Sequence, residues 1–171
     1  MKDTQLRIGM IGVTGRGGLW RHWHHPQGRS VMVGGADIAP DKLGLFASEH
    51  GGDPFITTDY RELLDRPDID AIAVCSPDFC HEKHAVAALE AGKQVFCEKP
   101  MAITIEGCDR ILTTWQRHGN HLMVGFNMRY MNIFRTMKEI IDSGAIGEIK
   151  AVWVRHFVGM GGDFYYHDWH A

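Results

Sequence analysis

Short apolar segments alternate with segments of helical spacing along most of this chain, and that alternation limits the possible folds more than any other feature of the sequence. The apolar segments predict strands at residues 6–11, 30–36, 55–57, 71–75, 94–97 and 122–126. The segments of helical spacing lie between them, at residues 17–25, 40–50, 60–64, 79–91 and 105–118. Several of the strands are apolar throughout, as in a parallel sheet that is covered on both faces.

Residues that begin and end helices support this division. Asp59 and Asp78 stand at positions of N-caps, and Gly92 and Gly119 stand where left-handed C-caps follow a helix. Parallel strands require crossover connections, and those connections are right-handed. We therefore predict an α/β fold with a doubly wound parallel sheet.

The pattern changes close to Gly125, where we place a domain boundary. Residues 133–143 predict a helix that ends at Gly144, and residues 148–158 predict an alternating strand. With 171 residues the chain has room for one domain of about 100 to 150 residues and part of another. We expect a first domain over residues 1–124 and, over residues 125–171, the truncated start of an α/β substrate domain.

Charge and cysteine spacing narrow the class of partner. The net charge is −3 and the basic residues are scattered, which does not match a nucleic-acid-binding or membrane-binding surface. The four cysteines form no CxxC pair, so we interpret them as reduced thiols. The sequence shows no secretory signal and no apolar stretch that could span a bilayer. We predict a cytoplasmic protein whose partner is a small molecule.

A glycine-rich turn follows the first predicted strand and precedes the first helix. On the GxGxxG template Gly12 takes the tight-turn position, Thr14 replaces the second glycine and Gly17 permits close packing of helix on strand. Gly15 stands beside Thr14 and can allow the close backbone approach instead, while Arg16 completes the turn. The helix N-terminus would then offer N–H groups to a pyrophosphate, which predicts a Rossmann-type dinucleotide site.

An acidic residue at the end of the second strand supports that prediction. Asp37 lies 20 positions after Gly17, where a carboxylate accepts hydrogen bonds from the adenosine ribose. Ile38 follows it and is assigned to the same site. The adjacent residues include no Arg or Lys for a 2′-phosphate, which the carboxylate would repel. The sequence therefore favours NAD over NADP.

Several motifs together resemble the glucose-fructose oxidoreductase/inositol dehydrogenase (Gfo/Idh/MocA) family. The resemblance runs from Leu6 to the end of the chain, and its motifs are Ile11-Gly12, Gly15-Arg16-Gly17, Cys75-Ser76-Pro77 with His81, Ala91-Gly92-Lys93, Glu98-Lys99-Pro100, Val124-Gly125-Phe126-Asn127 with Arg129-Tyr130, and Ser143-Gly144 with Ile146-Gly147-Glu148-Ile149. It implies an NAD(P)-dependent oxidoreductase that acts on a hydroxyl of a sugar, polyol or related compound. It also implies further catalytic residues beyond Ala171 and a homo-oligomeric full-length protein, so residues 1–171 alone should not turn over substrate.

The resemblance assigns roles to individual residues. Lys99 matches the family's catalytic lysine, just past a strand end where open α/β sheets bind ligands. A cation there stabilises a developing alkoxide and can relay the hydroxyl proton. By the same resemblance the cofactor is lined by Ser76, Pro77, His81, Glu98 and Asn127, with Arg129 near the nicotinamide or substrate. His81 equally fits a packing role. The family pattern also implies a cis peptide before Pro100.

Other interpretations remain at this point. Some relatives use bound NAD transiently to cleave a glycosidic bond without net redox change, and a non-catalytic dinucleotide sensor would share the glycine turn. Histidine-rich residues 22–25 and 167–170 suggest metal ligands, but neither cluster has convincing ligand spacing, so we predict no metal site.

Overall fold

The chain folds into two compact units, Met1–Gly125 and Phe126–Ala171. The structure is a computed structural model and describes residues 5–155. The division between the units falls at Gly125, where the sequence pattern changes.

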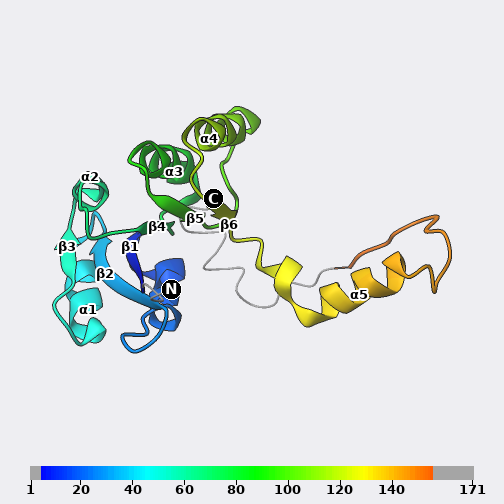
Figure 1. The fold of residues 1–171 in the computed structure, drawn as a ribbon, viewed down its shortest axis with the longest axis horizontal. Coiled ribbons are helices and arrows are strands. Elements are labelled where there is room, and N and C mark those ends of the chain that lie inside the picture. Colours follow the sequence, from blue (N-terminus) through cyan, green and yellow to red (C-terminus); the bar gives the residue numbers. More distant parts are fainter. Residues whose placement is uncertain (1–4, 156–171) are drawn as a thin grey trace. The chain divides into compact units, whose positions relative to one another are not determined.

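The first unit is built on a six-stranded sheet in which every strand pair is parallel (Figure 1). The strands are β1 (Leu6–Ile11), β2 (Ser30–Ala36), β3 (Phe55–Thr57), β4 (Ala71–Val74), β5 (Gln94–Cys97) and β6 (Leu122–Val124). Their order across the sheet is β3-β2-β1-β4-β5-β6. The chain thus winds outward in both directions from between β1 and β4, which confirms the doubly wound fold of the Rossmann type.

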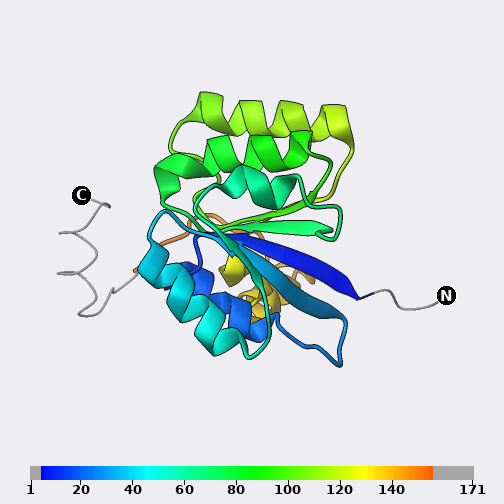
Figure 2. The same ribbon diagram turned by 90° about the vertical axis from the view of Figure 1, so that its left-hand side faces the viewer.

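Helical segments cover both faces of this sheet (Figure 2). The 3₁₀ segment η1 (Gly15–His22) and helix α1 (Pro40–His50) lie on one face. On the other lie α2 (Tyr60–Leu64), the 3₁₀ turn η2 (Asp78–Cys80), α3 (His81–Glu90) and α4 (Ile105–His118). As predicted, Asp59 caps α2 by accepting from the Arg61 N–H at 3.0 Å, and Gly92 and Gly119 have the left-handed φ of C-caps.

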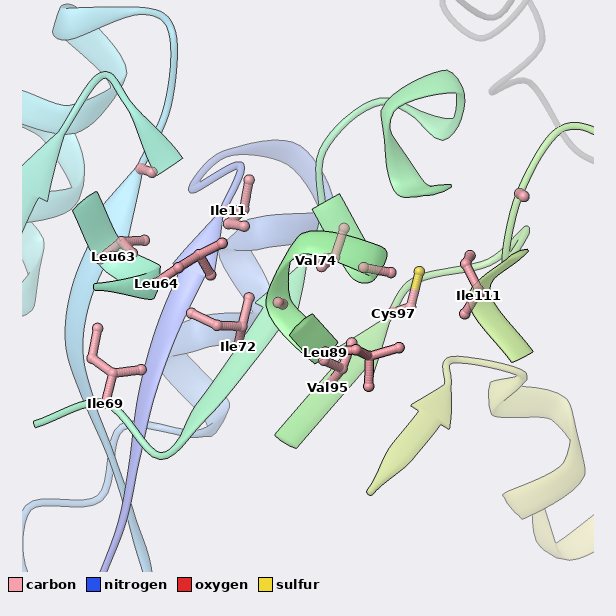
Figure 3. Packing of buried hydrophobic residues seen from close by; sticks show 14 residues of the cluster. Ile11, Leu63, Leu64, Ile69, Ile72, Val74, Leu89, Val95, Cys97 and Ile111 are labelled. Atoms are coloured by element: carbon pink, nitrogen blue, oxygen red, sulfur yellow. The ribbon is translucent and has the colours of Figure 1, made fainter. Parts of the chain in front are cut away.

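Two buried clusters, one on each face, hold the layers together. Every residue of β4 is buried, and alternate side chains go to opposite clusters. Ile72 and Val74 pack with Leu63 of α2 and Leu89 of α3 (Figure 3). The opposite cluster joins β1, β2 and β4 to η1 and α1 and contains Ile8, Met10, Trp20, Met32, Leu43, Phe46, Ala71, Ala73 and Cys75. A strand buried on both faces explains why the segment is apolar throughout.

Some element limits differ from the sequence-based prediction. β4 and β6 are one and two residues shorter than expected, and the first helical segment is a 3₁₀ segment that ends at His22, three residues early. Closely spaced glycines disfavour a regular α-helix there. The Asp78 side chain makes no capping hydrogen bond, because Asp78 lies inside the 3₁₀ turn that precedes α3. That cap prediction was wrong.

The described part of the second unit contains the 3₁₀ turn η3 (Asn127–Tyr130) and helix α5 (Asn132–Asp142), which matches the predicted helix within one residue at each end. The predicted strand at 148–158 does not form over residues 148–155, and residues 156–158 lie outside the described part. An extended segment becomes a strand by pairing with a neighbour. Residues 148–155 have no paired strand within the described chain.

We predict that Gly17→Ala destabilises the first unit strongly. A Cβ at Gly17 would lie 1.8 Å from the Gly12 carbonyl oxygen, so the turn and η1 must separate. We expect a loss of about 3 kcal/mol in the free energy of unfolding, measured in urea. Gly44→Ala is the control, because Gly44 lies within α1 with nothing within 4 Å of an added Cβ, and should gain about 1 kcal/mol. A Gly17→Ala protein as stable as the wild type would contradict this packing.

Candidate functional site

The predicted functional residues of the first unit gather at one edge of the sheet. Gly12, Asp37 and Glu98 directly follow β1, β2 and β5, and Ser76 comes two residues after β4. Because these four strands are neighbours and parallel, their carboxyl ends lie at the same edge. β1 and β4 flank the point where the winding direction reverses, which is where doubly wound sheets bind their ligands.

Two glycines make the turn after β1 possible. Gly12 has a φ of 84°, and a Cβ there would lie 2.8 Å from the Cys75 carbonyl oxygen. Gly17 is buried against the Gly12 carbonyl, as described above. Thr14 has an extended backbone with a φ of −115°, so the GxGxxG second position needs no glycine here. The Thr14 carbonyl accepts from the Gly17 N–H at 2.9 Å and closes the turn.

Gly15 provides the open space at this turn. Its φ is 58°, it is exposed, and a Cβ added to it would meet nothing within 4 Å apart from its neighbours in the chain. A bulky ligand group can therefore approach the backbone at the start of η1, next to exposed Arg16. The turn has the shape of a phosphate cradle, with a cation beside it.

The Asp37 carboxylate is joined to the glycine turn. Its Oδ2 accepts from the Val13 N–H at 3.3 Å, and its Oδ1 accepts from the Ala39 N–H at 3.1 Å. Each carboxylate oxygen can accept a further hydrogen bond, so the group can hold a pair of vicinal hydroxyls. Ile38 is 91% exposed beside it and offers an apolar surface at the same strand end.

The Glu98-Lys99-Pro100 segment continues β5 into the site. Glu98 is 8% exposed, and its N–H donates to the Val74 carbonyl at 2.9 Å, which ties the segment to the end of β4. The Glu98 Oε2 accepts from the Lys99 N–H at 3.0 Å. Gly125 leaves room for this carboxyl group, since a Cβ there would lie 3.3 Å from Oε1. The Lys99 residue is exposed, and the bond to Pro100 is cis as predicted.

A histidine that the sequence did not single out contacts Ser76. The Ser76 Oγ lies 2.9 Å from the His84 Nδ1, and the His84 ring lies 4.4 Å from that of Tyr60, measured between ring centroids. Burial, with a smaller contribution from nearby Lys83, lowers the His84 pKa to about 4. His84 is therefore neutral near pH 7 and can hold the serine hydroxyl by a hydrogen bond. No sequence spacing indicated this pair, because Ser76 lies on a loop and His84 on α3.

The surroundings of His81 favour a packing role over the cofactor contact that the resemblance implies. The side chain is buried, with 1% of the residue exposed. Its Nδ1 lies 2.6 Å from the Pro100 carbonyl oxygen and its Nε2 lies 2.8 Å from that of Ser76. Each ring nitrogen thus faces a backbone carbonyl oxygen, and a neutral ring donates its single N–H to one of the two. Neither nitrogen is left free for a ligand. Pro77 directly follows Ser76 and is half-buried.

The remaining predicted residues lie in the second unit. Asn127 and Arg129 belong to η3, after the boundary at Gly125. Their assignment to cofactor and substrate stays a prediction.

The cysteines next to the site are not suited to act as nucleophiles. Burial, together with the charge of Glu98, raises the pKa of Cys97 to about 12, and the pKa of Cys75 is raised by the same causes. Both are therefore thiols near neutral pH and serve as small apolar side chains.

The histidines of residues 22–25 are explained in part by backbone contacts. The His24 Nδ1 accepts from the Met32 N–H at 3.3 Å, and the His25 Nε2 lies 2.7 Å from the His22 carbonyl oxygen. Across residues 5–155, no three His, Cys, Asp or Glu side chains are grouped as metal ligands. Residues 167–170 lie outside the described residues.

None of the helices in the described range is long and apolar enough to cross a bilayer.

Together these groups place an open glycine turn, a carboxylate with spare acceptor capacity and an exposed lysine along one sheet edge. Such an arrangement can bind a dinucleotide across the point where the winding reverses, with Asp37 at one end and Lys99 toward the other.

Comparison with known proteins agrees with this geometry. A family model described as "Oxidoreductase family, NAD-binding Rossmann fold" matches residues 6–126. An inositol 2-dehydrogenase of Ralstonia nicotianae is 36% identical over 166 residues, which cover 95% of this chain and 49% of that protein.

Solved structures show the same fold. The apo scyllo-inositol dehydrogenase of Lactobacillus casei aligns with a TM-score of 0.80 and 27% identity, over 87% of this chain and 44% of that one. The myo-inositol dehydrogenase of the same species, in complex with NAD(H) and myo-inositol, aligns with a TM-score of 0.79 and 30% identity, over 84% and 43%. The chain thus spans about half the length of these relatives. It belongs to the Gfo/Idh/MocA oxidoreductase family, in which this region is an NAD-binding Rossmann domain.

Proposed function

We propose that residues 1–124 form the NAD-binding domain of a dehydrogenase that transfers a hydride between NAD and a hydroxyl-bearing carbon of a sugar or polyol. The observation that carries this proposal is the meeting of the glycine turn, Asp37 and Glu98-Lys99-Pro100 at the carboxyl ends of adjoining strands. Residues 125–171 would then begin the domain that binds the substrate.

NAD fits the residues at this edge. The open backbone at Gly15 can admit the pyrophosphate, and the two oxygens of Asp37 can accept from the ribose hydroxyls. A phosphate on the 2′ position would meet the Asp37 carboxylate instead, which is repulsive. Ser76, held by His84, lies on the opposite side of the glycine turn from Asp37, since β4 and β2 flank β1.

Lys99 supplies the acid–base step in this proposal. Bound NAD would accept the hydride at its nicotinamide. Oxidation of a carbinol also removes the hydroxyl proton, and the Lys99 amine can take that proton or stabilise the alkoxide that forms. The buried Glu98 carboxylate holds the Lys99 backbone N–H and so fixes the start of the side chain.

The substrate class rests on the relatives. All three relatives described above are named as inositol dehydrogenases, and one is described in complex with NAD(H) and myo-inositol. We accordingly propose a polyol or sugar of that kind, and a homo-oligomeric full-length protein on the family resemblance alone.

All four cysteines are free thiols, which is typical of a reducing compartment and supports a cytoplasmic location.

Asp37→Ala should weaken NADH binding to this chain by about 1 to 3 kcal/mol, because charge-assisted hydrogen bonds to the ribose are lost. Binding of NADPH should change much less. Titrations of NADH fluorescence measure both. Asp41→Ala, an exposed carboxylate in the first turn of α1, is the control and should bind NADH as the wild type does. Equal or tighter binding of NADPH by the wild type would overturn the assignment of Asp37.

Lys99→Ala should mainly lower turnover in a full-length enzyme that contains this domain. We expect kcat to fall by about 10²-fold or more while the Kd for NADH stays within about tenfold, because the amine acts most strongly in the transition state. Lys42→Ala in α1 is the matched control. Near-normal turnover of Lys99→Ala would refute the catalytic role and favour a dinucleotide sensor.

A further inference from the structure

His81 connects the two loops that carry the predicted reactive groups. As the first residue of α3, it is buried beneath the site, and its ring lies within hydrogen-bond distance of the Ser76 and Pro100 carbonyl oxygens. Ser76 follows β4, whereas Pro100 follows β5. These two contacts therefore join two separate loops through one side chain.

The next residue of α3 fixes the far end of the second loop. The Glu82 carboxylate accepts from the Arg110 guanidinium of α4, with Nη2 at 2.9 Å from Oε2. A Cβ at Gly107 would lie 2.6 Å from the same Oε2, so the first turn of α4 lies directly against Glu82. α4 begins after Thr104, whose Oγ1 accepts from the Gly107 N–H at 3.0 Å. The segment from Glu98 to Thr104 is thus anchored near both ends by consecutive residues of α3.

The anchoring by His81 differs from that by Glu82. The Glu82–Arg110 pair is exposed to solvent, which weakens such pairs. The His81 side chain is buried, its contact with the Ser76 carbonyl is buried and its contact with the Pro100 carbonyl is part-buried, and a carbonyl shielded from water that loses its hydrogen-bond donor is costly. His81 is therefore the stronger constraint on the part of the loop next to Lys99.

We propose that His81 is a positioning residue that fixes the Glu98–Pro100 segment against the end of β4, so that Lys99 and Ser76 meet the same bound dinucleotide. The contact with the dinucleotide rests on the proposed function. The fixing of the loop rests on the His81 geometry alone. The assignment thus gives His81 an indirect role in the site, through backbone carbonyls.

The test compares three variants of this chain. His81→Phe keeps a buried ring but removes both ring nitrogens, and His81→Gln keeps a side-chain N–H donor. Leu89→Ala, in the same helix, removes core packing but leaves both His81 ring contacts in place, and it serves as the control for lost stability. Urea unfolding curves are recorded for each protein first, so that the later measurements are made under conditions in which all the proteins are folded.

The first measurement is amide hydrogen exchange over residues 98–104 and over β1. His81→Phe should accelerate exchange in the loop by about tenfold or more while β1 is unaffected, because a local constraint is lost. His81→Gln should recover part of the protection. Leu89→Ala should leave the ratio of loop to β1 exchange as in the wild type. If His81→Phe and Leu89→Ala give the same ratio, His81 is a core residue only and the proposal fails.

The second measurement is acylation of the Lys99 amine with and without NADH, followed by mass spectrometry, with exposed Lys42 as the internal reference. NADH should slow acylation of Lys99 in the wild type, and this protection should be lost in His81→Phe and partly regained in His81→Gln. Full protection in His81→Phe would overturn the positioning role. If the wild type shows no binding of NADH, the proposed function fails, and the exchange ratios still decide whether His81 fixes the loop.

Discussion

The close contact between Gly17 and the Gly12 carbonyl is the constraint on which the rest of the site depends. It places the start of η1 directly above the end of β1, and the Gly12 turn in turn lies against Cys75 and Ser76. No side chain larger than hydrogen fits at either glycine without moving backbone. This packing sets the backbone path of the turn. It thereby sets the open backbone at Gly15, the hydrogen bond from Val13 to Asp37 and the position of Ser76.

Much of this architecture could be predicted from the sequence, because its determinants are local. Runs such as β4, apolar at each position, indicate strands buried on both faces, and the winding rule then orders the sheet. The glycine turn and Asp37 are likewise recognisable by their spacing. Residues 148–155 show where a local pattern is not enough. Their alternation of apolar and polar residues favours a strand, but a strand forms only by backbone hydrogen bonds to a neighbouring strand, and the described residues contain none for this segment.

The side-chain roles that could not be predicted from the sequence depend on contacts between residues far apart in the chain. His81 could equally have been a ligand contact or a packing residue, and only the two carbonyls around it decide between them. The pairing of His84 with Ser76 is of the same kind. Lys93 is another example. A lysine is usually exposed because of its charge, yet Lys93 is 9% exposed and its Nζ donates to the Arg66 and Ile69 carbonyls. Each role arises where separate elements meet.

The hydrogen bond from Val13 to Asp37 has a consequence for the evolution of cofactor choice. One carboxylate accepts from the Val13 N–H of the glycine turn and, in the proposed function, also repels a 2′-phosphate. A lineage that exchanged this residue for a small or basic one would admit NADP but would also release the Val13 N–H and loosen the phosphate cradle. Switching the coenzyme is therefore coupled to the rigidity of the turn. A compensating acceptor near Val13 would be needed in any descendant or redesigned enzyme that retains tight binding.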